Sequence, residues 1–505
     1  MIIDEILTNF EGGGQHNFYS FETFILNLLK YHIEQQGNKF VLVENIRGLG
    51  DAYAEDGFDS FKGKTLIEIR FSLDRIPSRI FIDQLVSRLT KSEKYEEFEN
   101  FLIISYKPVS ARFKARLIEE VSKVNERLKV VIWGPEEINK IVSKHKKHAT
   151  TIASNLFSLR LETAVSKETG DWEKEREERI GLLIDFYERG QFALFLGAGV
   201  SSSAGMPDWN TLLNSLFVSY LTKEFTTNTN ISDEDIKQIV IRLNEIDEPS
   251  ALMAARYLRK GLSKEASEAR EFTNIITDNL YKLRNTQRDL NSALIVSIAN
   301  LCMPRRTGAK VRSVITYNFD DLIERGLQLK SIQHRSIYTD NEAYDPDELP
   351  IYHVHGFLPE DVKTYERLEK STLVFSEEGY HQIYTEAYHW SNLVQLTNLR
   401  ENNCLMIGLS MTDPNLRRLL DISARNLDRP KHFAFMRRMT LDMFVYSSGK
   451  DGGDGQVIKN TKGAEQFLNR HHKLNEEIMK ELGVSIIWFN DFDEIPQILS
   501  RINGK

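Results

Sequence analysis

Phe192-Ala193-Leu194-Phe195-Leu196-Gly197-Ala198-Gly199-Val200-Ser201 is an apolar run that ends abruptly in small residues. It continues through Ser202–Trp209, and apolar side chains at helical spacing follow at Leu212, Leu213, Leu216, Phe217 and Tyr220. This pattern predicts a buried strand, a glycine-rich turn and a helix. Because glycine has no Cβ, the backbone N–H groups of such a turn can approach a phosphate closely. The stretch therefore predicts a nucleotide site if other parts of the chain converge on it.

Further strand-like runs follow, each ending in polar or small residues, and helical patterns separate most of them. Strands that alternate with helices predict a parallel, doubly wound α/β sheet of the Rossmann-like type. The runs are Val311–Ile315, Pro350–Val354, Thr372–Phe375, Cys404–Ile407, His432–Met436 and Ser485–Phe489.

Polar residues stand at the carboxyl ends of these runs. In a doubly wound sheet those ends share one edge, and ligands bind in the crevice there. We therefore expect Gly197, Asn318, His355, Gly408 and Ser410 to meet at one rim, although some 200 residues separate the first from the last. An amide and an imidazole beside a phosphate-type loop suit a nucleotide that undergoes a reaction.

The order of four motifs resembles the sirtuin superfamily over about residues 185–500. The motifs are Gly-Ala-Gly-Val-Ser…Gly-Met-Pro-Asp-Trp, Thr-Tyr-Asn-Phe-Asp, His-Gly and Gly-Leu-Ser. The resemblance implies that Asn318 orients the nicotinamide ribose or a water, and that His355 is the general base. It further implies an NAD-binding set: phosphate contacts from Gly197, Ala198, Gly199 and Ser201, the nicotinamide pocket from Asp208, Trp209 and Asp320, and adenosine contacts from Gly408 and Ser410.

Two departures from the protein-deacylating sirtuins change the expected function. Those enzymes insert a zinc ribbon with two Cys-x-x-Cys pairs after His-Gly, whereas no cysteine follows Gly356 until Cys404, and Asn210 stands in place of their arginine. The remaining pattern resembles the sirtuin-like NADases of bacterial antiphage defence. That resemblance implies hydrolysis of NAD⁺ to nicotinamide and ADP-ribose in abortive infection, with NAD⁺ as substrate and no required cofactor. It also implies a homo-oligomer and a HerA-type ATPase or other defence partner.

Residues 1–150 read as a separate α/β domain. Asp59 precedes Glu68-Ile69-Arg70 by nine residues, and the pattern resembles the Asp…(Asp/Glu)-x-Lys restriction-endonuclease superfamily, especially its Mrr-like branch. Two carboxylates at adjoining strand ends could bind Mg²⁺ and activate water. Arg70 replaces the lysine of that family and is a poor substitute for a point cation. We expect a nuclease-like fold that serves assembly or sensing, with Mg²⁺ needed only if it cleaves.

The composition places further bounds on the chain. A length of 505 residues predicts two or three domains. The resemblances imply a restriction-endonuclease-like domain at 1–150 and a sirtuin-like domain at 181–505, and we expect a charged helical linker at 151–180 and a helical insertion at about 220–300. Residues 1–150 are electrically balanced and the net charge of −8 belongs to the remainder, so bulk charge does not support nucleic-acid binding. Two cysteines, no long apolar run and no basic leader predict a cytoplasmic protein without a membrane span.

Two other functions stay open at this point. One is a DNA-directed nuclease of a defence system regulated by NAD or ADP-ribose, which requires Asp59, Glu68 and a tolerated Arg70. The other is a non-enzymatic sensor of an NAD derivative, against which the intact Asn318 and His355 argue.

Overall fold

The computed structural model describes residues 15–43, 50–70, 95–156, 172–208, 266–340, 342–371, 388–425, 429–448 and 454–504, with short isolated stretches between and a few single residues missing from these ranges. The expected Trp209 and most of the expected insertion at 220–300 lie outside the described residues. The chain forms two compact units. One comprises Met1–Leu182, Asp421–Pro430 and Met439–Ser485, and the other comprises Leu183–Leu420, Lys431–Arg438 and Ile486–Lys505. The expected domain boundaries stay a prediction.

The first unit contains a five-stranded mixed sheet of order β1-β2-β5-β6-β7. Its strands are β1 (Phe40–Leu42), β2 (Ala52–Ala54), β5 (Thr65–Arg70), β6 (Asn100–Ser105) and β7 (Lys129–Trp133). The two pairings of β2 are antiparallel, whereas β5, β6 and β7 run parallel. A two-stranded ribbon, β3 (Gly57–Phe58) and β4 (Phe61–Lys62), is inserted between β2 and β5.

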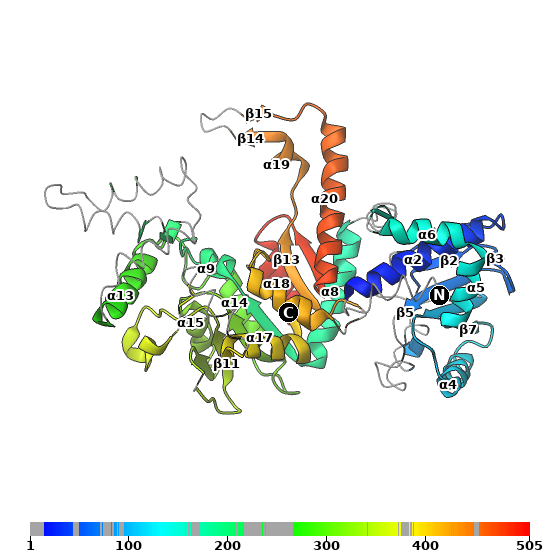
Figure 1. Ribbon diagram of the computed structural model, residues 1–505. Coiled ribbons are helices and arrows are strands. Elements are labelled where there is room, and N and C mark those ends of the chain that lie inside the picture. The colour runs from blue at the N-terminus through cyan, green and yellow to red at the C-terminus, as the bar shows by residue number, and fades with distance from the viewer. Residues whose placement is uncertain are drawn as a thin grey trace. The chain divides into compact units, whose positions relative to one another are not determined.

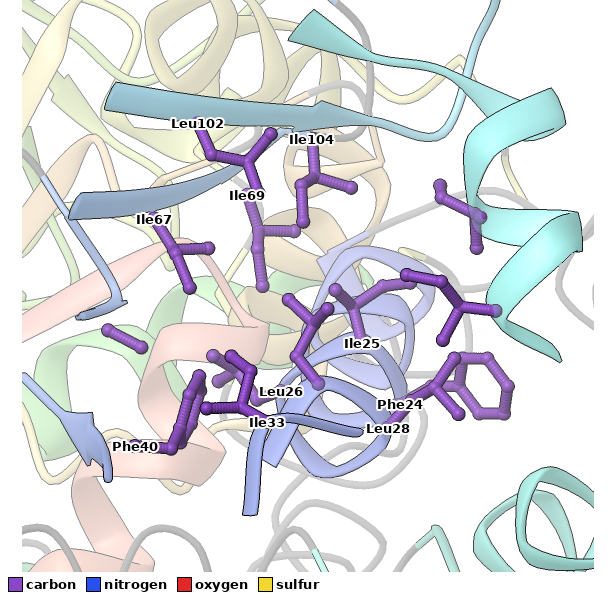
Figure 2. Packing of buried hydrophobic residues seen from close by; sticks show 14 of the residues in the cluster. Phe24, Ile25, Leu26, Leu28, Ile33, Phe40, Ile67, Ile69, Leu102 and Ile104 are labelled. Atoms are coloured by element: carbon purple, nitrogen blue, oxygen red, sulfur yellow. The ribbon is translucent and has the colours of Figure 1, made fainter. Parts of the chain in front are cut away.

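Helices cover both faces of this sheet. On one face α2 (Gln15–Glu34), α5 (Pro135–Lys144) and α6 (Lys146–Ser154) lie side by side (Figure 1). Figure 2 shows Ile25 and Leu26 of α2 near Ile67 and Ile69 of β5, in the core of this face. The other face packs against α4 (Ala111–Ser122). Each helix thus buries one side against the sheet, and the central strands β5 and β6, covered on both faces, are buried at every residue.

The same unit includes the first part of α8 (Trp172–Arg189) and a segment of the chain between β13 and β16. This segment consists of α19 (Leu441–Val445), a two-stranded ribbon of β14 (Tyr446–Ser448) with β15 (Asp454–Gln456), and α20 (Thr461–Glu481). A buried ion pair joins Arg179 of α8 to Glu476 of α20, with Arg179 Nη1 2.9 Å from Glu476 Oε1.

The second unit is built on a seven-stranded sheet of order β10-β11-β9-β8-β12-β13-β16. The neighbouring pairs from β10 to β13 are all parallel, which confirms the expected parallel α/β sheet. The strands are β8 (Phe192–Leu196), β9 (Val311–Thr316), β10 (His334–Ile337), β11 (Leu349–His353), β12 (Asn403–Ile407), β13 (His432–Arg437) and β16 (Val484–Phe489).

One expected strand is wrong. Leu373 and Val374, from the run at 372–375, belong to no strand, and the Val374 N–H donates to the His355 carbonyl at 2.8 Å. The edge position is taken instead by β10, a short and partly exposed strand whose apolar alternation is weak. An edge strand needs less apolar surface than a central one, so periodicity is a poor guide there.

Helices lie between these strands, and one more follows the last strand. They are α9 (Ala198–Ser203), α13 (Ala266–Lys282), α14 (Ala293–Cys302), α15 (Leu322–Leu329), α17 (Trp390–Glu401), α18 (Pro414–Ala424) and α21 (Glu494–Ile502). None of the helices in the described part of the chain has both the length and the apolar composition that a bilayer span requires.

Candidate active site

The strand order changes direction at β8, because β9 lies on one side of it and β12 on the other. Such a switch point leaves a crevice at the carboxyl edge of a parallel sheet. Gly197 directly follows β8, Asn318 lies two residues beyond β9, and Gly408 directly follows β12. The three predicted motifs therefore meet at the place where a doubly wound sheet binds its ligand.

Glycines let the β8–α9 turn lie directly against the end of β12. The Gly197 N–H donates to the Ile407 carbonyl and the Gly199 N–H donates to the Gly408 carbonyl, both at 2.9 Å. A Cβ on Gly199 would lie 2.8 Å from Gly408 Cα, and one on Gly408 would lie 2.7 Å from the Val200 nitrogen. Close backbone approach thus explains these glycines.

This packing occupies two of the N–H groups that the sequence assigned to phosphate. Ala198 is the first residue of α9, so its N–H has no acceptor within the helix. The expected phosphate contacts of Gly197, Ala198, Gly199 and Ser201 stay a prediction. Among the described residues the Ala198 N–H has no backbone acceptor, so it is the group of this turn that we expect to donate to a phosphate.

The Asn318 side chain is buried and held in one orientation. Its Nδ2 donates to the Gly197 carbonyl at 3.0 Å and to Ser201 Oγ at 2.7 Å. Because a carbonyl only accepts, the first bond identifies which amide atom is the nitrogen. Oδ1 makes no hydrogen bond to any described residue, and it remains as an acceptor for a ligand hydroxyl or a water.

Ser201 connects Asn318 to Asp320. It accepts from the Asn318 amide, and its own hydrogen bond to the Asp320 carboxylate lowers the pKa of that group. Burial has the larger effect and raises the pKa of Asp320 to about 6. The three side chains form one hydrogen-bonded chain beneath the turn, so Ser201 has a structural role that the phosphate assignment did not anticipate.

His355 lies two residues beyond β11 against the ring of Tyr317, with ring centroids 4.8 Å apart in an edge-on arrangement. Burial lowers the pKa of His355, and the Asp413 carboxylate partly opposes this shift. The distance from His355 Nε2 to Asp413 Oδ2 is 3.9 Å. A neutral imidazole at pH 7 can accept a proton, which fits the expected role of a base.

A buried pair lies behind Asn318. His353 Nδ1 is 3.3 Å from the Asn318 carbonyl oxygen, and His353 Nε2 is 2.6 Å from Glu324 Oε1. Ser336 Oγ donates to the same carboxylate oxygen at 2.8 Å. Both ring nitrogens of His353 thus face acceptors, and the β9–α15 loop that carries Asn318 is tied to α15 and β11.

The remaining expected site residues are less enclosed. Asp208 is exposed and its Oδ1 accepts from the Thr211 N–H at 2.8 Å, which is a helix-capping contact. Ser410 is exposed and lies 2.6 Å from the Thr412 hydroxyl. Their expected roles in binding NAD stay predictions.

Sequence reasoning missed two features of the site. Asp413 follows Gly408-Leu409-Ser410 at the end of β12, so its place after a strand was the signal that could have identified it. The His353–Glu324 pair carried no such signal, because a histidine inside an apolar strand and a glutamate inside a helix look ordinary in sequence.

In the first unit, Glu68 is paired with Asp51 and not with Asp59. Ala52 of β2 lies opposite Ile67 of β5, so Asp51 is carried to the position opposite Glu68. The Asp51 Oδ2 accepts from the Ile69 N–H at 2.7 Å. Burial, together with the negative charge of Glu68, raises the pKa of Asp51 to about 7.

This carboxylate pair is already occupied by donors. Glu68 Oε2 accepts from the Gly50 N–H at 2.5 Å, and Glu68 Oε1 forms an ion pair with Arg70. A divalent cation needs several oxygen ligands free of such partners. The residues therefore do not fit a Mg²⁺ site.

Asp59 lies in the turn of the β3–β4 ribbon, with a positive φ of 49°. Its Oδ2 is 2.8 Å from His32 Nε2, and its Oδ1 accepts from Gln36 Nε2 at 3.0 Å. The expectation that Asp59 and Glu68 form one site therefore fails, because the ribbon inserted between β2 and β5 brings Asp59 to α2.

Comparisons with known proteins agree with the fold of the second unit. Residues 312–448 match the family model described as SIR2-like domain. The chain is 25% identical over 325 residues to a protein of Enterococcus faecium named NAD(+) hydrolase ThsA. That similarity covers 63% of this chain and 56% of the relative, so the chain spans little more than half of the curated relative that it matches. The part of the chain that holds Asn318, His355 and Asp413 is thus similar to SIR2-like domains, and a stretch of 325 residues is similar to a protein named as an NAD⁺ hydrolase.

Proposed function

We propose that the chain hydrolyses the N-glycosidic bond of NAD⁺ and releases nicotinamide and ADP-ribose. The observation that supports this most directly is the fixed amide of Asn318 at the switch point of the sheet, with Oδ1 available as an acceptor. His355, in the loop after the neighbouring strand β11, supplies a buried imidazole with a lowered pKa. The similarity to a protein named as an NAD⁺ hydrolase supports the same reaction.

In the proposed reaction the bond between ribose C1′ and the nicotinamide nitrogen breaks first. The electron pair of that bond neutralises the pyridinium ring, so nicotinamide leaves without being protonated. The water oxygen adds to C1′, and His355 accepts the proton that the water loses. Asn318 Oδ1 accepts a hydrogen bond from the ribose or the water and so orients the attack.

The groups around Asn318 and His355 support their proposed roles. Asp413 lies 3.9 Å from His355 Nε2, where its negative charge stabilises the imidazolium that forms in the reaction. The buried Asn318–Ser201–Asp320 chain keeps the amide from rotating, so its acceptor atom is preorganised. Whether water or a ribose hydroxyl attacks decides between ADP-ribose and a cyclised product.

The proposed reaction is tested by nicotinamide release from NAD⁺ with the purified full chain. Asn318→Ala and His355→Ala are each expected to lower kcat by about 100-fold or more, as loss of a positioned polar group or base does. His334→Ala and Asn291→Ala are the matched controls, since these residues lie on the edge strand β10 and before α14. Full turnover in both site variants would contradict the proposal.

We further propose, from the resemblance to antiphage effectors, that the reaction depletes cellular NAD⁺ when a defence partner releases it. A HerA-type ATPase and self-association are the partners to examine. The measurement is NAD⁺ content in bacteria that express the chain with and without its neighbouring genes, before and after phage infection. A constant NAD⁺ level after infection would contradict this role while leaving the hydrolysis itself untouched.

A further inference from the structure

An open groove runs along the outer face of α6 in the first unit. It has a volume of about 810 Å³, and the described residues that line it are eight, between Ser143 and Asn155. All eight are polar, and three are the lysines Lys144, Lys146 and Lys147. The groove is separate from the candidate active site, which belongs to the second unit.

The charge of this groove is concentrated on lysines that the described residues leave without an ion-pair partner. The three lysine side chains are exposed, and within the described part of the chain none of them forms an ion pair with a carboxylate. The sequence contains no Asp or Glu from Ile138 to Leu161, in a chain whose net charge is −8. Local charge thus differs from the bulk charge, which by itself did not support an anionic partner.

The opposite side of α6 is anchored in the protein. His145, between the lysines, lies with Nε2 2.9 Å from His32 Nδ1, and His148 stacks on Tyr31 with ring centroids 3.8 Å apart. Ala149 is fully buried in the core. The lysines are therefore presented by a helix that is held in place, so little backbone order is lost when an anion binds.

The shape of the groove suits an extended polyanion. The nine residues of α6 rise about 13 Å, and duplex DNA carries about one negative charge per 1.7 Å of its axis, so α6 can face several phosphates. Lysine, Ser/Thr and Asn side chains are common partners of phosphate oxygens. Protein interfaces, in contrast, have an apolar or aromatic centre, which the described lining residues do not provide.

The groove also lies away from the degenerate nuclease motif. Arg70 is the last residue of β5, at the carboxyl edge of the parallel strands, and α5 begins at that edge two residues after β7. The ten residues of α5 then rise about 15 Å before the junction with α6 at His145. Binding at the groove therefore does not require cleavage at Glu68 and Arg70.

We propose that the α5–α6 groove binds the phosphodiester backbone of nucleic acid without reading its base sequence. The first unit would then act as a nucleic-acid-binding module of the chain. Binding rests on Lys144, Lys146 and Lys147, and its strength falls as salt concentration rises because bound counterions are released.

The test measures binding of the full chain to a fluorescent duplex of about 20 base pairs and arbitrary sequence, between about 50 and about 200 mM salt. The variant Lys144→Gln/Lys146→Gln/Lys147→Gln is compared with Lys62→Gln/Lys107→Gln/Lys129→Gln. The second variant removes the same charge from exposed lysines at scattered positions of the same unit.

The groove variant is expected to weaken binding by about tenfold or more at about 100 mM salt and to make the log–log salt slope shallower by about 2.7. The control variant is expected to bind within about twofold of the native chain, because salt screens charges that lie more than about 10 Å from the bound phosphates. Circular dichroism of both variants checks that they fold, and NAD⁺ hydrolysis without nucleic acid is expected to be unchanged. Activity thus tests the proposed function separately from this inference.

Three results would overturn the inference. One is no binding by the native chain at the lowest salt concentration, and another is an equal loss in the groove and control variants. The third is displacement of the duplex by polyglutamate as effectively as by unlabelled duplex at equal charge, which would assign the groove to an acidic protein segment.

Discussion

Replacing Gly408 by alanine tests the close contact that builds the candidate site. Gly408 has a φ of +69°, and an added Cβ would lie 2.7 Å from the Val200 nitrogen and 3.0 Å from Gly199 Cα. These atoms are backbone, so no side-chain rotation can relieve the overlap. The turn after β8 and the end of β12 would have to separate, which weakens the hydrogen bond from the Gly199 N–H to the Gly408 carbonyl.

A matched variant separates the two contributions to the loss of stability in Gly408→Ala, the backbone strain and the overpacking. Gly190 has a similar φ of +74°, and no atom of a described residue lies within 4 Å of its added Cβ. Gly190→Ala therefore carries only the left-handed backbone penalty, about 1 kcal/mol of the free energy of unfolding. Gly408→Ala adds the cost of overpacking, about 2 kcal/mol, for a total of about 3 kcal/mol.

Thermal unfolding of the purified variants measures the difference. At roughly 3 °C per kcal/mol for a unit of this size, Tm is expected to fall by about 3 °C in Gly190→Ala and by about 9 °C in Gly408→Ala. The KM for NAD⁺ is expected to rise only in Gly408→Ala, because only that change moves the turn. Equal losses of Tm in the two variants, with an unchanged KM, would refute the packing of this turn against β12.

Three further outcomes follow from the charges of buried groups. Because burial lowers the pKa of His355, the imidazole stays neutral as pH falls to the ordinary histidine value of 6.5, so kcat/KM is expected to stay level from pH 8 to 6.5 and to decline only below pH 6.5. Asp413→Asn removes the negative charge that raises this pKa, and it is expected to move the decline of kcat/KM to lower pH. A move of the decline to higher pH would contradict the assignment. Glu324→Gln removes a carboxylate from the buried hydrogen-bonded pair with His353 and is expected to cost about 3 kcal/mol of the free energy of unfolding, against under about 1 kcal/mol for Glu360→Gln at the exposed partner of Arg325. Burial by itself raises the pKa of Glu324, but His353 and the Ser336 hydroxyl together lower it below its ordinary value. That stability is therefore present above pH 4.5 and is lost as pH falls through the folded pKa, which unfolding curves at several pH values measure. The full chain is expected not to nick supercoiled DNA with Mg²⁺ or Mn²⁺, and metal-dependent nicks that disappear in Asp51→Asn would show that the carboxylate pair binds metal after all.

Much of the second unit could be predicted from the sequence, because its signals are local. Buried parallel strands are short apolar runs, and the residue that ends each run is visible directly. The rule that parallel strands share one carboxyl edge then brought Gly197, Asn318 and Gly408 together without any contact being known.

Strand register and long-range contacts were beyond the same reasoning. Nothing within a strand says which residue of a distant strand lies opposite it. The sequence pattern therefore predicts Asp59 as the partner of Glu68, whereas the antiparallel register of β2 and β5 brings Asp51 there. The weak edge strand β10 was missed for a related reason, since an edge strand buries too little apolar surface to stand out.

The sequence by itself determined the class of the fold, the order of its motifs and the residues at the sheet edge, because local periodicity and strand ends encode them. Only the tertiary structure decided how the Asn318 side chain is oriented and which donors pair with the Glu68 carboxylate. It also decided that Lys144, Lys146 and Lys147 line one groove. Those features depend on which surfaces meet after folding, and a hydrogen bond or an open groove exists only between atoms that packing has brought together.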